Sequence, residues 1–282
     1  MSCQKAEHAS AHHLSEAGKG EVIPLYDDDE QVRASGSVKA GVRDLSRWVR
    51  FQLAEGTWDG KPLVSKENLL ETRTPQIVVP VPGLLKREAG TTQASYGLGW
   101  HVEDYRGHTL ISHGGAVDGF RARITLVPRA KLAVVVLANL DVSEMPAALS
   151  FALLDRMLGL PNKDWNAPYA AQREKERALA REAEKARQAS RRKGTKPSRE
   201  LAAYAGTYRH PAYGVARVSV EKGRLVLAWG RSRLPLEHFH FDTFTGLPPD
   251  RLAGRVATFT LGADGTPARL RFLGQDFRRD KQ

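Results

Sequence analysis

The alternation of apolar and polar positions divides the chain into a helical stretch, a strand-rich block, a charged segment and a second strand-rich block. In residues 38–56, VKAGVRDLSRWVRFQLAEG, apolar side chains recur at the three- and four-residue spacing of a helix. Ser65 precedes a second, short helical pattern that ends before Pro75. Residues 76–93 are punctuated by proline and glycine and predict a loop, and residues 1–36 predict irregular structure.

The strand-rich block covers residues 96–141. Turn signals at Arg106–Gly107 and at Pro128–Ala130 separate its strands, so the block predicts an antiparallel meander. Residues 132–139, LAVVVLAN, are apolar on both faces and predict a central strand. An apolar helical pattern follows over residues 143–161.

The rest of the chain predicts a charged helix and a separate all-β module. Between residues 173 and 199 there are 11 Lys or Arg against 4 Glu, at spacings that support an exposed helix. From residue 200 the period changes to two, and short strands with glycine-containing turns predict a small barrel or half-barrel. We therefore expect an α+β protein with these parts: an irregular segment over 1–33, a first domain over 34–165, a charged helical linker over 166–199 and a β-barrel-like domain over 200–282.

Composition narrows the classes of function. The net charge of +11 invites a nucleic-acid interpretation, but most of the excess lies in the linker, where no aromatic residues interleave with the charges. We therefore expect a solvated connector and no nucleic-acid binding. The chain contains no run of eighteen apolar residues, so we expect no membrane span, and residues 1–21 lack the apolar core of a signal peptide. The single cysteine, Cys3, allows no internal disulfide.

One stretch of the first block, LISHGGAVDGF at residues 110–120, places a histidine and two glycines in a strand. Glycine weakens a strand and often marks a close approach to the backbone. Taken by itself the pattern has a simpler reading, since a histidine on a strand is commonly a packed or surface residue and Gly-Gly is commonly a turn.

The order of motifs around this stretch resembles a known family. GVRDLSRW, YGLGW, SHGG, GFRARITLVP, LAVVVLAN and an apolar helix follow one another as in the C-terminal half of the penicillin-recognising serine hydrolases, over residues 34–161. That group contains class C beta-lactamases, DD-peptidases and related esterases. The resemblance implies a truncated antiparallel sheet with helices and a site for amide or ester hydrolysis.

The resemblance also implies roles for four residues. In this family a strand beside the nucleophile carries Lys-Thr-Gly or His-x-Gly. His113 stands at the lysine position, and Gly114 and Gly115 at the substrate-binding positions that follow it. The backbone N–H of Ala116 would be an oxyanion donor, a contact worth about 3 kcal/mol of transition-state stabilisation. His113 would donate near the nucleophile's hydroxyl or help to place a substrate carboxylate.

The family's nucleophile, a serine with a lysine one helical turn later, has no credible match. Ser2 with Lys5 begins the chain, and Ser190 with Lys193 lies in the charged linker, downstream of the strand instead of upstream. The second family motif, Tyr-x-Asn or Ser-x-Asn, does not occur. We therefore expect the downstream part of a serine hydrolase: a gene fragment, a chain with a misassigned start or one half of a split protein. It would be inactive alone and would act on a small acyl substrate only if completed by the missing half.

The alternative is a non-catalytic protein that binds a ligand or a partner. No cofactor is expected in either case. The compartment stays open, because the family is usually extracytoplasmic in bacteria but this chain shows no export signal.

The C-terminal block resembles the lipocalin-like domain of unknown function that often follows such hydrolases, through YAGTYRHPAYG, GRLVLAW, LEHFHFDTF and FTLGADG. His238 and His240 alternate with aromatic residues, but no third ligand is evident, so we expect packing and no metal site. We expect Asp242 to support a turn. The remaining expectations concern single residues: His101 and His108 as exposed strand positions, His8, His12 and His13 in a disordered segment, and Trp48, Trp100 and Trp229 in the core.

Overall fold

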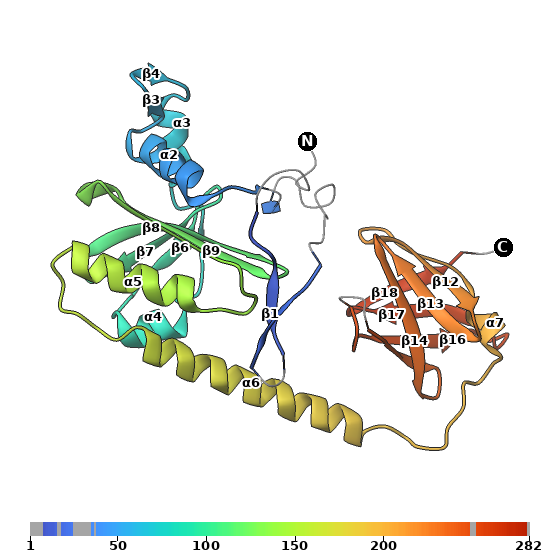
Figure 1. Ribbon diagram of the computed structural model, residues 1–282. Helices are drawn as coiled ribbons and strands as arrows, with labels where there is room; N and C mark the ends of the chain where they lie inside the picture. The colour runs from blue at the N-terminus through green and yellow to red at the C-terminus, as the bar shows by residue number, and fades with distance from the viewer. Residues whose placement is uncertain (1–7, 16–17, 25–34, 37, 249–251, 281–282) are drawn as a thin grey trace. The chain divides into compact units, whose positions relative to one another are not determined.

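The computed structural model of the chain describes residues 8–15, 18–24, 35–36, 38–248 and 252–280. The chain divides into two compact units, residues 1–178 and residues 179–282 (Figure 1). Each unit has its own hydrophobic core. Residues 25–34 of the expected irregular segment, together with Ser2, Cys3 and Lys5, lie outside the described residues.

Unit 1 is built on a six-stranded antiparallel sheet with the order β10-β9-β8-β7-β6-β5 (Figure 1). Arg106 and Gly107 both have positive φ, 46° and 87°, as a two-residue hairpin turn requires, and they join β7 to β8. A short 3-10 turn at Pro128–Ala130 joins β9 to β10. Both turns agree with the sequence prediction. The strands are β5 (Ile77–Val78), β6 (Ala94–Tyr96), β7 (His101–Tyr105), β8 (His108–Val117), β9 (Phe120–Val127) and β10 (Leu132–Ala138).

Helices cover both faces of this sheet. Helices α4 (Gly83–Glu88) and α5 (Met145–Met157) contribute to one core, and α2 (Val42–Leu53) contributes to the other. Strand β10 alternates between the two cores along its length. This explains its continuous apolar sequence, but among the described strands β10 lies at the end of the sheet order. The prediction of a central strand is therefore wrong, because an apolar run reports covered faces and not the number of neighbouring strands.

Several local predictions are confirmed and others are corrected. Helix α3 (Lys66–Glu71) begins after Ser65, whose Oγ accepts a hydrogen bond from the N–H of Asn68 at 3.2 Å. Residues expected to form a loop instead contain β5 and α4, and the described part of the expected irregular N-terminal segment contains a small hairpin. Trp48 is 45% exposed, so its assignment to the core is wrong. The additional short strands are β1 (His12–Leu14), β2 (Gly20–Val22), β3 (Thr57–Trp58) and β4 (Lys61–Pro62).

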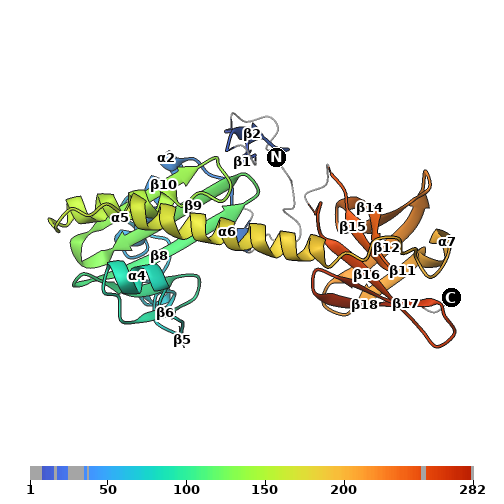
Figure 2. The ribbon, with the colours of Figure 1, turned by 90° about the horizontal axis from the view of Figure 1, so that it is seen from below.

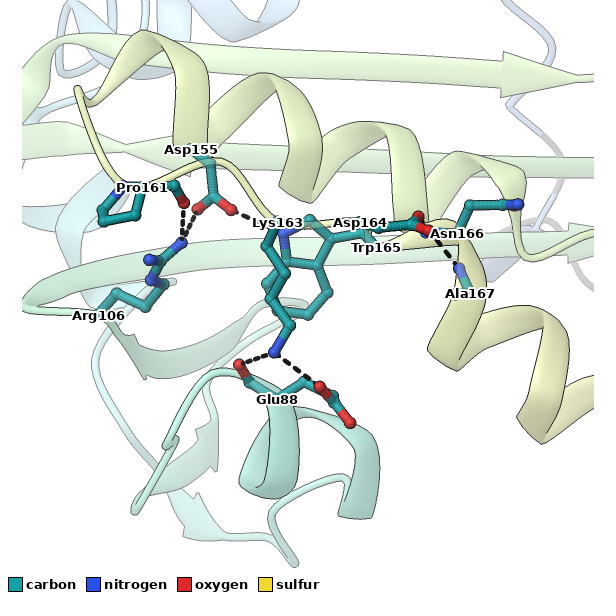
Figure 3. A network of polar contacts seen from close by, with 9 residues as sticks. All are labelled: Glu88, Arg106, Asp155, Pro161, Lys163, Asp164, Trp165, Asn166 and Ala167. Atoms are coloured by element: carbon teal, nitrogen blue, oxygen red, sulfur yellow. Dashed lines mark hydrogen bonds and ion pairs between the residues drawn. The ribbon is translucent and has the colours of Figure 1, made fainter.

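A buried carboxylate ties α5 to the hairpin that begins β8 (Figure 3). Asp155, 1% exposed, accepts hydrogen bonds from the phenol of Tyr105 at 2.5 Å and from the indole Nε1 of Trp165 at 2.7 Å. The guanidinium of Arg106 lies 2.7 Å from the same carboxylate and also donates to the carbonyl of Pro161. Asp155 on α5 therefore holds the β7–β8 hairpin and the chain after α5 together.

Helix α6 (Asn166–Ala189) confirms the predicted charged helix, and the boundary between the units falls within it. No helix in the described part of the chain is both long and apolar enough to span a membrane.

Unit 2 contains a closed antiparallel barrel of eight strands, β11 to β18 (Figures 1 and 2). Its interior is filled by a continuous core of aromatic and aliphatic side chains, among them Tyr208, Phe244 and Phe277. Helix α7 (Leu201–Tyr204) adds Leu201 and Tyr204 to the same core. The strands are β11 (Gly206–His210), β12 (Gly214–Glu221), β13 (Arg224–Trp229), β14 (Ser232–His240), β15 (Thr243–Gly246), β16 (Val256–Leu261), β17 (Pro267–Phe272) and β18 (Gln275–Arg279).

Candidate active site

The stretch singled out in the sequence forms the second half of β8. Strand β8 pairs with β9 along its whole downstream half, as far as Val117 opposite Phe120. Its pairing with β7 is shorter and ends at Ser112 opposite His101, where β7 begins. His113 to Val117 are all exposed. Strand β8 therefore continues past the end of its neighbour and presents one backbone edge there.

The register determines which groups face that edge. In an antiparallel ladder, successive residues direct their N–H and C=O groups to opposite sides. Tyr105 and His108 close the two-residue turn, so His108 and every second residue after it direct these groups toward the β7 side. Gly114 and Ala116 belong to this set but lie beyond the last β7–β8 pair. Their N–H and C=O groups therefore face the side of β8 that β7 leaves open.

The two glycines have different steric surroundings. Neither has a positive φ, so the backbone conformation itself does not demand glycine. A Cβ on Gly115 would lie 3.3 Å from the Cβ of Ala122, its partner on β9, which is a tight contact. A Cβ on Gly114 would meet only the carbonyl oxygen of Ala122 at 3.6 Å, an ordinary contact. Packing within the protein thus explains in part why residue 115 is a glycine, but it does not explain the glycine at position 114.

Two side chains that the sequence did not identify lie beside His113. The Oη of Tyr96 on β6 is 3.1 Å from the Nε2 of His113. The ring centroid of His101 lies 4.7 Å from that of Tyr96 and 6.0 Å from that of His113. His101 and His108 are both half-buried, so the prediction of exposed positions is wrong for both residues. Burial, with the positive fields of His113 and Arg123, lowers the pKa of His101. The sequence motif YGLGW contains Tyr96, but its contact with His113 depends on the order of the strands in the sheet and could not be inferred from the motif.

A buried polar residue, Ser112, directly precedes His113 on β8. Ser112, 2% exposed, receives a hydrogen bond of 3.4 Å from the guanidinium of Arg123 on β9, which also stacks over the ring of Phe151 at 5.0 Å. Glu103 on β7 is 6% exposed, and burial raises the pKa of its carboxyl group against the opposing effect of Arg123. The arginine therefore connects the strand that carries His113 to α5.

Two Ser-x-x-Lys strings lie within the described residues, and the serine of each has a local hydrogen-bond partner. Ser190 follows α6 in unit 2, and its hydroxyl donates to the carbonyl of Arg187. A third Ser-x-x-Lys string, Ser219 to Lys222, was overlooked in the sequence; it lies at the β12–β13 hairpin, where the Ser219 hydroxyl donates to Glu221. Within unit 1, Ser112 is buried against Arg123, as described above.

The histidines of the barrel have structural contacts. The Nε2 of His238 lies 2.9 Å from the carbonyl oxygen of Phe241, and the Nδ1 of His240 accepts from the N–H of Arg192 at 3.3 Å. Among the residues that the structure describes, no group of three His, Cys, Asp or Glu side chains could hold a metal ion. Asp242 accepts from the N–H and hydroxyl of Ser198 and from the phenol of Tyr204, so it joins the chain before α7 to the barrel.

Comparison with known families agrees with this architecture. Residues 3–157 match the beta-lactamase family, and residues 190–282 match a domain of unknown function, DUF3471. The chain therefore belongs to the beta-lactamase family and carries this second domain after it.

Two curated relatives are named as hydrolases. The chain is 26% identical to "Unguisins hydrolase ungD'" of Aspergillus campestris over 281 residues, covering 93% of this chain and 50% of the relative. It is 27% identical to "Unguisins hydrolase ungD" of Aspergillus violaceofuscus over 278 residues, covering 88% of this chain and 47% of the relative. The chain thus spans about half the length of the curated relatives it matches.

Among solved structures, the chain is similar to the octameric penicillin-binding protein homologue from Pyrococcus abyssi. The two are 19% identical with a TM-score of 0.46, and the match covers 98% of this chain and 54% of that one.

Proposed function

We propose that the chain provides one wall of a serine hydrolase site that cleaves an amide or ester, with the exposed edge of β8 as the surface on which the acyl group lies. The observation that carries the proposal is the early end of β7–β8 pairing. It leaves the backbone groups of Gly114 and Ala116 on the open side of β8. The family membership and the two relatives named as hydrolases support the reaction class.

The edge can bind a substrate as an additional strand would bind. The N–H of Ala116 donates to the acyl oxygen, and the carbonyl of Gly114 accepts from an N–H of the ligand. As the acyl carbon becomes tetrahedral, negative charge develops on its oxygen, and the same N–H then contributes about 3 kcal/mol of stabilisation. The absence of a side chain at Gly114 lets the ligand backbone approach closely.

His113 is the polar side chain at the start of the exposed stretch that contains this donor. Its Nε2 is engaged with Tyr96, which restrains the ring at the start of the exposed stretch. We propose that it donates to the attacking hydroxyl or to a substrate carboxylate.

We further propose that this chain, used alone, forms no acyl-enzyme and that the attacking hydroxyl is supplied by a segment outside it. Ser190 and Ser219 both donate to groups within unit 2, and Ser112 is buried against Arg123. The hydroxyls of Ser190 and Ser219 are thus engaged within unit 2, and Ser112 lacks the exposure that an attacking hydroxyl requires.

Two measurements on the full chain test these proposals separately. Titration with benzylpenicillin, followed by amide NMR, is expected to shift the Gly114 and Ala116 resonances, and Gly114→Val is expected to abolish the shifts. The matched control is Thr109→Val, an exposed position in the paired half of β8. Shifts that avoid residues 113–117, or that persist in Gly114→Val, contradict the substrate wall. Labelling with a fluorophosphonate is expected to fail, and a labelled serine overturns the claim about the nucleophile.

A further inference from the structure

The outer surface of the barrel carries three arginines in one row. Arg278 on β18 lies directly opposite Arg209 on β11 and, on its other side, directly opposite Arg269 on β17. All three are exposed, whereas the residues that precede them on β11 and β18, Tyr208 and Phe277, are buried in the interior. The row therefore belongs to the outer face of three adjacent strands.

This arrangement opposes the stability of the barrel. Directly opposite side chains in a sheet have Cβ atoms about 5 Å apart, and like charges at such positions repel. Arg209 is compensated by Asp280, with its Nε 2.7 Å from a carboxylate oxygen. Within the described part of the chain, Arg278 and Arg269 have no acidic partner in an ion pair. Two adjacent guanidinium groups thus remain available to an external anion.

The row borders a cavity. A cavity of about 500 Å³ is lined by Arg209, His210, Pro211, Arg269, Asp276 and Arg278. A second one, of about 450 Å³, shares Arg209, His210, Pro211 and Arg278 with it. The Asp276 carboxylate in the lining is 3.4 Å from Arg271, so its negative charge is partly compensated.

The cavity also has a neutral donor. The Nδ1 of His210 accepts from the N–H groups of Ala212 and Tyr213, each at 3.1 Å. A nitrogen that accepts hydrogen bonds carries no proton, so the neutral imidazole bears its proton on Nε2. His210 therefore adds an N–H donor to the lining beside the guanidinium groups.

We propose that this cavity binds a small, multiply charged oxyanion, of the phosphate or polycarboxylate type, held between Arg278 and Arg269. Guanidinium groups bind such anions through paired N–H donors, and the charge of the ligand relieves the repulsion within the row. The barrel interior is filled by its own aromatic core, which leaves the outer face as the place for a ligand. The site lies in unit 2, whereas the β8 edge lies in unit 1.

Calorimetric titration of the full chain with pyrophosphate, at constant ionic strength set by chloride, tests the proposal. We expect saturable binding that weakens about tenfold in Arg278→Gln and in Arg269→Gln, as loss of one charge-assisted contact predicts. The matched control is Arg217→Gln, an exposed arginine on β12 outside the row, which should bind as the unaltered chain does. A parallel titration with citrate distinguishes a polycarboxylate ligand from a phosphate ligand, and stronger binding of either supports the site.

A second readout does not depend on choosing the right anion. Without ligand and at low ionic strength, Arg278→Gln should raise the midpoint of thermal unfolding, because it removes the central charge of the row. Added pyrophosphate should then raise the midpoint less in Arg278→Gln than in the unaltered chain. The proposal is overturned if neither anion binds beyond the chloride control, or if Arg217→Gln weakens binding as much as Arg278→Gln. Binding of single-stranded DNA that pyrophosphate does not displace would also contradict it.

Discussion

The phenol oxygen of Tyr96 lies 3.1 Å from the Nε2 of His113, although β7 separates their two strands in the sheet. The contact is possible because β7 begins only at His101, so the second half of β8 is not covered by its neighbour. The same strand geometry thus exposes the proposed oxyanion donor and brings a phenol to the histidine that precedes it.

The hydrogen bond between these two side chains should be measurable as a coupling energy. In a double-mutant cycle with Tyr96→Phe and His113→Gln, we expect a coupling of about 0.5–1 kcal/mol in urea unfolding, the usual value for one hydrogen bond. A cycle that pairs Tyr96→Phe with His108→Gln, at the other end of β8, should be additive. Additive behaviour in the first cycle would contradict the contact.

His101 should make stability depend on pH. Burial and the nearby His113 and Arg123 lower its pKa in the folded protein, so folding favours the neutral ring. Its contribution is therefore complete above the unfolded pKa of about 6.5 and is lost as the pH falls toward the lower folded value. We expect His101→Gln to flatten the fall in unfolding free energy below pH 6.5, whereas His108→Gln serves as the control. A fall of unchanged steepness in His101→Gln would exclude this residue as its source.

The two glycines of β8 should respond differently to alanine. Gly114 has a compatible backbone, and a Cβ there would make only an ordinary contact, so Gly114→Ala should stabilise the chain by about 0.5 kcal/mol through the entropy of the unfolded state. Gly115→Ala should not, because its Cβ would crowd Ala122. If Gly114 is kept for a ligand, the more stable variant will bind benzylpenicillin more weakly. Urea unfolding and the NMR titration of the same two proteins measure both effects, and unaltered binding by Gly114→Ala would remove the functional reason for this glycine.

The sequence was most informative where a local rule applies. The turn at Arg106–Gly107, the cap at Ser65 and the period of two in the barrel each depend on residues close together in the chain, and all three are present in the structure. The open edge of β8 could not be read from the sequence, because it depends on where a neighbouring strand begins.

The partners of His113 were missed for the same reason. Tyr96 and His101 reach it through the order of three strands, which no spacing along the chain encodes. Trp48 shows the opposite error, since its helical spacing placed it on the apolar face but it lies 45% exposed on α2.

Asp155 should be among the most sensitive positions of unit 1. Its carboxylate is buried and accepts a hydrogen bond from the phenol of Tyr105. It also accepts from Trp165 and pairs with Arg106 (Figure 3). Asp155→Asn removes the negative charge and leaves the guanidinium without its partner, so we expect a loss of about 3–5 kcal/mol. Asp164→Asn, at the exposed start of α6, should cost less than about 1 kcal/mol because asparagine also caps helices. Similar losses in the two variants, measured by urea unfolding, would contradict this role.

The barrel has its own acid-sensitive carboxylate in Asp242. Although burial alone would raise the pKa of Asp242, the hydrogen bonds from Tyr204 and Ser198 outweigh it and lower that pKa. A depressed carboxyl pKa adds stability that is present above the unfolded value, about 3.9, and is lost as the pH falls through the folded value. Asp242→Asn should therefore lower the unfolding free energy at pH 7 by about 1–3 kcal/mol and make it less dependent on pH below 4.

The unfolding free energy of the barrel, measured as a function of pH below 7, tests this role of Asp242. Asp276→Asn, an exposed carboxylate on the outer face of β18, is the matched control, since its contact with Arg271 at 3.4 Å is open to solvent. Asp242 accepts a hydrogen bond of 2.8 Å from the N–H of Ser198 and so joins this residue to the barrel. Asp242→Asn should therefore also speed hydrogen exchange of the Ser198 amide. If amide exchange at Ser198 is unchanged and the two variants share one acid profile, Asp242 does not hold the segment before α7 against the barrel.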